Sequence, residues 1–198
     1  MIKSSKLTEL KVDILEQSKN LFQRFGYHKT TLTDIAKSVG KVKTAIYYYF
    51  SGKEEIFAQL VKHEAEVFYS KLEKAVNKET NTIDKLETYV DTRIRLMQKI
   101  STRYSFLKQE FFELMPIVEE NRADAHQREI QFVETILRNG IANKSIRCSS
   151  PQFTAEMLVN SLKGLEIQMY VTDSIVVDTE NSAAFRSFIL YGAIHKNE

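Results

Sequence analysis

The chain has 198 residues, of which 43% are hydrophobic and 27% are charged, and its formal net charge is +2. No apolar run approaches the length of a membrane span and no secretory signal pattern is present, so we expect a cytoplasmic protein with no membrane partner. A single cysteine excludes an intramolecular disulfide. Two prolines and six glycines among many helix-favouring residues predict an all-α fold.

Positive charge is concentrated at the N-terminal end of the chain. Through Lys53 the sequence has ten Lys and Arg against four Asp and Glu, a net charge of +6, while the remaining residues carry −4. A basic segment of this kind is the electrostatic footprint of a surface that binds a polyanion. A membrane-surface helix would also need a broad apolar face left uncovered. The charge distribution therefore favours DNA as the partner.

The first predicted helix covers residues 7–25. Its apolar residues recur at spacings of three and four, and Gly26 closes it. Residues 1–6 are polar and basic without periodicity, so we expect an arm that precedes the helix. This first helix would supply the core of a small N-terminal domain.

Residues 31–50 carry the pattern of two short helices joined by a glycine-centred turn. Thr31 and Asp34 form a capping-box pattern that begins the first helix, and Gly40 ends it after about two turns. A second helix is predicted from about Val42 to Phe50. Spacings of four along it would bury one face, formed by Val42, Ile46 and Phe50. Helix, glycine turn and helix together are the helix-turn-helix pattern.

The exposed face of the second short helix carries groups that suit DNA. Lys43 and Thr44 lie at its start, where a recognition helix presents side chains to base edges. Tyr47, Tyr48 and Lys53 can donate hydrogen bonds to phosphates. For any one of these residues a solvated basic face with half-buried aromatics is the alternative. Their ordered combination favours DNA binding.

A series of residues between positions 8 and 60 resembles the N-terminal signature of TetR-type one-component transcriptional regulators. The matching residues are Gly26-Tyr27, Thr30-Thr31, Asp34-Ile35-Ala36, Gly40, Ile46-Tyr47-Tyr48-Tyr49-Phe50 and Lys53-Glu54-Glu55. By this resemblance, the positions that contact the DNA backbone are Thr31, Thr33, Tyr47, Tyr48 and Lys53. The positions that read or approach bases are, by the same resemblance, Lys43, Thr44 and Tyr49.

The sequence departs from that family at the start of the recognition helix. The family usually has a small apolar residue followed by a capping Ser, whereas this chain has Lys41 and Val42. The departure predicts a shifted helix start or a different operator. Loss of a Ser cap typically costs about 1 kcal/mol, which the fold should tolerate.

A long helix and a larger helical body follow the head. Ser51 and Glu54 repeat the capping-box form, and an apolar stripe continues to about Val76. Asn77–Asn81 is a polar break that predicts a loop or hinge. Further helices are predicted at residues 82–100, 103–113, 117–139, 151–171 and 178–194, with Pro116 at a helix start and residues 174–177 as a packed connector.

We therefore predict a division into two domains with about nine helices in total. Residues 1–53 would form the helix-turn-helix DNA-binding domain. Residues 54–198 would form a helical domain that, by the TetR resemblance, binds a ligand and dimerises. Aromatic, soft and polar residues in this body would line a pocket for a small, mostly apolar effector, with ordinary packing the alternative for each: Tyr89, Arg93, Met97, Phe106, Phe111, Met115, Phe132 and Met157.

Pairing of two copies through the last two helices is expected, because one helix-turn-helix contacts one half-site of a palindromic operator. Burial of the same residues inside one protomer is the alternative. The apolar set is Ala155, Leu158, Val159, Leu162, Leu165, Phe185, Phe188, Ile189 and Ala193.

No catalytic or metal-binding pattern is present in the sequence. The four histidines are isolated, and neither a glycine-rich phosphate loop nor a nucleophile elbow occurs, so no cofactor, metal or catalytic residue is predicted. The interpretation is a homodimeric, ligand-responsive transcriptional regulator, with repression as the favoured sign. Two alternatives are a helical small-molecule-binding or scaffold protein without functional DNA binding, and a cofactor-independent helical enzyme.

Overall fold

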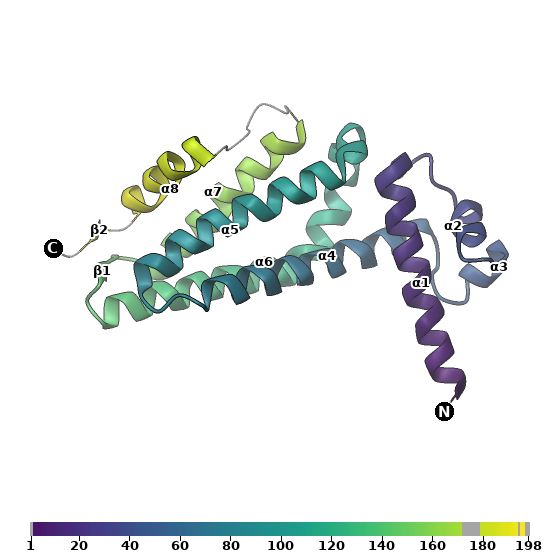
Figure 1. Ribbon diagram of the computed structural model, residues 1–198, viewed down its shortest axis with the longest axis horizontal. Helices are drawn as coiled ribbons and strands as arrows, with labels where there is room; N and C mark the ends of the chain where they lie inside the picture. The colour runs from purple at the N-terminus through teal and green to yellow at the C-terminus, as the bar shows by residue number, and fades with distance from the viewer. Residues whose placement is uncertain (1, 172–178, 194, 197–198) are drawn as a thin grey trace. The chain divides into compact units, whose positions relative to one another are not determined.

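The computed structural model describes residues 2–171, 179–193 and 195–196. Within these ranges the chain forms eight α-helices, one 3-10 helix and one pair of two-residue strands (Figure 1), which confirms the predicted all-α class. The helices are α1 (Ile2–Phe25), α2 (Leu32–Ser38), α3 (Lys43–Ile46), α4 (Lys53–Val76), α5 (Thr82–Arg103), η1 (Ser105–Glu110), α6 (Phe111–Ala142), α7 (Pro151–Val171) and α8 (Thr179–Ala193). The strands β1 (Ile146–Arg147) and β2 (His195–Lys196) pair antiparallel.

The chain divides into two compact units that are not continuous in sequence. The first unit contains Met1–Glu64 and Arg103–Arg122, and the second contains Ala65–Thr102 and Ala123–Glu198. Helices α4 and α6 each contribute residues to both units. The domain boundary predicted after residue 53 follows sequence order and stays a prediction.

The first unit has a hydrophobic core of its own. Ile14 and Phe22 of α1 are fully buried, as are Ile35 of α2 and Ile46 of α3, because the apolar faces of these short helices pack on α1. Leu114 of α6 is buried in the same core, although it lies far away in the sequence. The core of the small head is thus completed by a segment that comes after α5.

The recognition segment differs from its prediction in length and in burial. Helix α3 is a single turn, although the N–H groups of Tyr49 and Phe50 both donate to the Ile46 carbonyl, at 2.9 and 3.1 Å. Val42 is the N-cap, with extended backbone angles, and its side chain is 69% exposed rather than buried. An N-cap residue precedes the helical repeat, so the spacing that buries Ile46 does not carry Val42 onto the core face.

The start of α4 uses a different acid from the predicted Glu54. The backbone N–H and the hydroxyl of Ser51 donate to Glu55, at 2.6 and 2.8 Å. Because α4 begins at Lys53, Gly52 occupies the cap position and Glu55 the third helical position. The acid at the start of this helix is therefore one residue later than predicted, and it accepts both hydrogen bonds from the residue before the cap.

Two helix boundaries also differ from the predictions. Helix α1 begins at Ile2, so residues 2–6 are helical rather than an arm. Pro116 lies inside α6 rather than at its start, because the change from η1 to α6 at Phe111 has no marker in the sequence. The predicted connector at residues 174–177 lies outside the described residues.

The second unit is a helical body (Figure 1). Its hydrophobic core contains more buried residues than that of the first unit. Leu86 and Val90 of α5, Val133 and Leu137 of α6, and Val159 of α7 are fully buried there, because each helix turns its apolar stripe inward. Across the described parts of the chain, no helix has both the length and the apolar character that a membrane crossing requires.

Candidate nucleic-acid interface and its supporting network

The cap of α2 fixes the start of the helix-turn-helix. The Asp34 backbone N–H donates to the Thr31 hydroxyl oxygen at 3.2 Å, and the Thr31 N–H donates to the Asp34 carboxylate at 3.0 Å. The Thr31 hydroxyl also donates to that carboxylate at 2.6 Å. These hydrogen bonds lower the pKa of Asp34 below its ordinary value. The predicted capping box is confirmed, and it determines where α2 begins.

The turn from α2 to α3 depends on Gly40. Its φ is +66°, a left-handed conformation that residues with a Cβ rarely adopt. The Gly40 N–H donates to the Lys37 carbonyl at 3.1 Å, and the Lys41 N–H donates to the Ala36 carbonyl at 2.8 Å. The chain therefore reverses sharply after α2 and presents the start of α3 at the surface.

The exposed side of α3 and the turn after it carry half of the predicted DNA-binding residues. Lys43 and Thr44 are exposed at its start, and Thr33 is exposed on α2. Tyr47 and Tyr48, on the turn after α3, are 50% and 86% exposed. These side chains provide an ammonium group and several hydroxyl groups that can donate hydrogen bonds. Phosphate oxygens and base edges of DNA carry the acceptors that such donors bind.

Tyr49 and Lys53 lie differently from these exposed residues. Tyr49 is half-buried and packs against the core of the first unit. The Lys53 ammonium donates to the Tyr27 carbonyl at 2.9 Å and lies 4.2 Å from the centre of the Tyr27 ring. Burial lowers the pKa of Lys53, and the nearby Glu110 partly offsets that shift. An ammonium has three N–H donors, so a phosphate contact by Lys53 would add to this bond.

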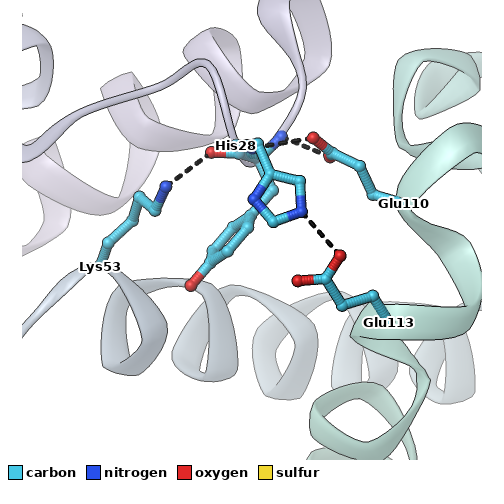
Figure 2. A network of polar contacts seen from close by, with 5 residues as sticks. His28, Lys53, Glu110 and Glu113 are labelled. Atoms are coloured by element: carbon cyan, nitrogen blue, oxygen red, sulfur yellow. Dashed lines mark hydrogen bonds and ion pairs between the residues drawn. The ribbon is translucent and has the colours of Figure 1, made fainter.

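The turn that follows α1 is held from two sides, as Figure 2 shows. The Glu110 carboxylate accepts hydrogen bonds from the backbone N–H groups of Tyr27, at 2.7 Å, and His28, at 2.8 Å. Lys53 binds the carbonyl of the same Tyr27. The His28 ring nitrogen Nε2 also lies 2.8 Å from the Glu113 carboxylate. We call these five residues the Glu110 clamp.

Gly26 makes room for the Glu110 clamp. Its φ of +84° is left-handed, and a Cβ added there would lie 3.3 Å from a Glu110 carboxylate oxygen. The clamp joins α6 and η1 residues to a turn that is 82 or more positions earlier in the sequence, and no local pattern marks Glu110 or Glu113 as partners of that turn. It orients the segment that leads to the Thr31 cap, which is why it belongs to the candidate site.

Glu110→Ala should lower the free energy of unfolding by about 1–2 kcal/mol, because two backbone N–H groups lose a charged acceptor in a partly buried site. Chemical unfolding in urea, with the midpoint and the slope both fitted, measures the change. Glu113→Ala is the matched control, since its pair with His28 is exposed and should contribute less than about 1 kcal/mol. Equal losses in the two variants would contradict a structural role specific to Glu110.

The residues predicted to line an effector pocket are distributed over the chain. On α5, Tyr89, Arg93 and Met97 are buried in the core of the second unit. Phe132 is half-buried there, its ring edge-on to Tyr69. The remaining four are Met157, which is 44% exposed on α7, Phe111 and Met115, which belong to the first unit, and Phe106, whose side chain lies outside the described part.

Two of the predicted lining residues on α5, Tyr89 and Arg93, belong to a buried polar network. The Arg93 guanidinium contacts Glu129 through Nε at 2.7 Å and Glu166 through Nη2 at 2.8 Å. The Tyr89 hydroxyl donates to Glu129 at 2.7 Å. Burial alone would lower the pKa of Arg93, but the two carboxylates together raise it above its ordinary value. Burial, with Glu129 beside it, raises the pKa of Tyr89 well above its ordinary value.

Glu129 and Glu166 have no marker in the sequence. Each is a single acid within a helix, where a solvated position is the usual expectation. Among the described residues, no group of His, Cys, Asp and Glu is arranged to hold a metal ion. The network is therefore a mixed-charge cluster in which the guanidinium is already engaged by two carboxylates.

The last two helices present an apolar face that differs from the predicted set. Ala155, Leu158, Val159 and Leu162 are buried within the protomer, so these members of the predicted pairing surface face inward. Ala193 has no described side-chain environment, whereas Phe188 of α8 is 78% exposed. Among the side chains that the structure describes on α7 and α8, the exposed large apolar residues are Phe153, Met157, Ile167, Phe188 and Tyr191, which we call the α7–α8 face.

The comparisons with known proteins agree with this geometry. The sequence profile described as "Bacterial regulatory proteins, tetR family" matches residues 14–60. The chain is 25% identical over 157 residues to the HTH-type transcriptional regulator YfiR of Bacillus subtilis (strain 168), which covers 77% of this chain and 76% of the relative. It is 45% identical over 53 residues to IcaR of Staphylococcus aureus (strain Newman), the biofilm operon icaADBC HTH-type negative transcriptional regulator.

The match to IcaR covers 27% of this chain and 28% of that relative, so it concerns only about a quarter of each protein. Among solved structures, a protein from Saccharomonospora viridis in complex with choline has a TM-score of 0.73 and 20% identity. That similarity covers 96% of this chain and 100% of the other. At this identity the similarity shows a shared fold.

Proposed function

Since this chain is a transcriptional regulator of the TetR family, we propose that it is a ligand-responsive repressor, which binds a palindromic operator as a homodimer and is released by a small, mostly apolar effector. The exposed face of α3, within residues 1–53 that carry a net charge of +6, supports the DNA-binding part of this proposal. IcaR is named a negative regulator, which supports repression as the sign. A protein that binds operator DNA must be in the same compartment as that DNA, so we propose that it is cytoplasmic.

Base reading is proposed for Lys43 and Thr44, which are exposed at the start of the recognition helix. Backbone contacts are proposed for Tyr47 and Tyr48, whose side chains are accessible beside them. Thr31, Thr33, Tyr49 and Lys53 complete the proposed DNA-binding set by family resemblance. Of these, Thr31 and Lys53 already make hydrogen bonds within the head, Thr31 to the Asp34 carboxylate and Lys53 to the Tyr27 carbonyl.

A direct test measures binding of the full-length protein to labelled duplexes that flank its own coding region, with a scrambled duplex of equal length as the control. We expect tighter binding to one flanking duplex and a steep loss of affinity with salt, because each phosphate contact releases counterions. Equal, weak binding to all duplexes would instead favour a helical small-molecule-binding or scaffold protein without functional DNA binding. The alternative that the protein is an enzyme would require that it convert a bound small molecule into a product.

We assign dimerisation to the α7–α8 face. Five apolar side chains are exposed there on two helices of one unit. Gly164 of α7 has open space at its missing Cβ, which allows a second backbone to approach closely. Two-fold pairing would present two recognition helices to half-sites about 34–36 Å apart, or a multiple of that distance.

Phe188→Glu should shift the protein from dimer to monomer at micromolar concentration. Phe188 is the most exposed large apolar residue of α8, and a carboxylate there would need to be desolvated in a paired interface. Sedimentation velocity over a concentration series measures the change. Val12→Glu is the matched control, because Val12 is a comparably exposed apolar residue on α1. A wild-type protein that is strictly monomeric at these concentrations would contradict the assignment.

The effector is proposed to bind within the helical body of the second unit, near the buried residues of α5. Tyr89, Arg93 and Met97 are the predicted lining residues that lie together in that core. Because two carboxylates already hold the Arg93 guanidinium, this residue is engaged within the protein, and a neutral or cationic effector fits better than an anionic one. The Saccharomonospora viridis protein, which shares the fold, is in complex with choline, and this supports small-molecule binding by such a body.

Release of DNA requires that the effector bind one conformation of the dimer better than another. A tenfold change in operator affinity corresponds to about 1.4 kcal/mol of coupling between the two sites. The chain passes from one unit to the other within α4, at the end of α5 and within α6, so these helices are the covalent connections available for such coupling. Titration of the protein–operator complex with candidate small molecules would measure it as a decrease in DNA binding.

A further inference from the structure

Val42 is an exposed aliphatic residue that immediately precedes Lys43 and Thr44, the residues proposed to read bases. It is the N-cap of α3, its side chain is 69% exposed, and it makes no side-chain capping hydrogen bond. Lys41 and Lys43 on either side of it are exposed too. A single exposed apolar residue would ordinarily need no explanation. This one stands where the first residues of a recognition helix meet base edges.

The chemistry of Val42 restricts what it can contact in a major groove. Its side chain has no donor or acceptor, so against a polar base edge it would leave that edge without a hydrogen bond. The thymine 5-methyl group is the apolar group that base pairs present in the major groove. Contact between two apolar groups removes both from water and leaves no polar atom unsatisfied.

We propose that Val42 is a specificity-determining residue that selects thymine in each operator half-site by contact with the 5-methyl group. This proposal rests on the proposed function, since it presupposes operator binding by α3. Val42 and Lys43 are adjacent, with Cα atoms about 3.8 Å apart, which is close to the rise of one base step. The selected thymine therefore lies within about two base pairs of the guanine that Lys43 is expected to read.

The experiment uses the full chain and a duplex that the protein itself has selected from a random pool. Each thymine of one half-site, and its symmetry mate, is replaced in turn by deoxyuridine, which lacks only the methyl group. At one position we expect wild-type affinity to fall about fourfold per half-site, the size expected for removing the burial of one methyl group. The remaining positions should change little.

Val42→Ser supplies the matched variant, because it removes the methyl groups and adds a hydroxyl that can cap α3. Its thermal midpoint should be no lower than that of the wild type, which separates base reading from folding. On the thymine duplex the variant should bind about as weakly as the wild type binds the deoxyuridine duplex. Replacement of the same thymine should then leave the affinity of the variant unchanged.

The outcomes separate this inference from the proposed function. Selection of a duplex, followed by deoxyuridine effects that are the same in wild type and Val42→Ser, would overturn the role of Val42 and leave operator binding in place. Failure of the wild type to enrich any duplex would overturn both. The inference is established if replacement of one thymine by deoxyuridine weakens binding by the wild type but leaves binding by Val42→Ser unchanged.

Discussion

Arg93→Ala is expected to lower the free energy of unfolding by about 3–5 kcal/mol, because it leaves two carboxylates in the core without their cation. Arg93 is 2% exposed, and Glu129 and Glu166 are each 5% exposed, so water cannot replace the guanidinium without opening the core. Calorimetry or urea unfolding of the purified protein measures the change. A change below about 1 kcal/mol would mean that the network is hydrated in solution, contrary to its burial in the structure.

A volume-conserving control separates the effect of charge from the effect of packing. Arg93→Met combined with Glu129→Leu, Glu166→Leu and Tyr89→Phe replaces the whole buried cluster by apolar groups, and such replacements are often neutral or stabilising. Tyr89→Phe is included because the Tyr89 hydroxyl would otherwise lose its acceptor on Glu129. We expect this quadruple variant to recover most of the stability that Arg93→Ala loses. A quadruple variant as unstable as Arg93→Ala would assign the effect to packing and would contradict the electrostatic explanation.

Lys43→Ala is expected to weaken binding to the cognate operator by about 1–3 kcal/mol, or about 5–150-fold, and to relax the preference at one position of each half-site. Lys43 is exposed at the start of α3, where its ammonium can reach guanine acceptors. Titrations on cognate and scrambled duplexes measure the two effects separately. Equal decreases in affinity on both duplexes would remove Lys43 from base reading and leave it as part of the basic face.

Lys53→Ala and Tyr48→Phe provide the contrast for that experiment. Lys53→Ala should weaken binding to all sequences alike and lower the salt slope by about one for each phosphate that is no longer neutralised. Tyr48→Phe removes a neutral hydroxyl, so it should weaken binding without changing the slope. Because Lys53 also holds the Tyr27 carbonyl, its variant should show reduced stability as well, which urea unfolding would reveal.

The parts of the fold that can be predicted from the sequence are those that depend on residues close together in the chain. The Thr31 capping box and the Gly40 turn depend on residues that are close in the chain, and both occur at the predicted positions. Ile46 and Phe50 are buried as their spacing predicts. The predicted burial of Val42 is wrong because apolar spacing alone does not show at which residue the helical repeat begins.

The parts that sequence cannot predict depend on contacts between distant residues. Glu110 binds a turn more than 80 positions earlier, and nothing near it distinguishes it from a solvated acid. Glu129 and Glu166 likewise become partners of Arg93 only when α5, α6 and α7 pack together. The sequence does indicate Arg93 as a functional candidate, but as a ligand contact rather than as the cation of a buried cluster.

The discontinuous first unit limits how this head could be transplanted. The family profile ends at residue 60, yet Leu114 fills the core of the head and Glu110 clamps its first turn. A graft of residues 1–60 onto a foreign body would expose apolar core surface and remove the acceptor of two backbone hydrogen bonds. A chimera that keeps this head intact must therefore carry residues 103–122 from the same parent, so recombination between such regulators would succeed as an exchange of two segments rather than one.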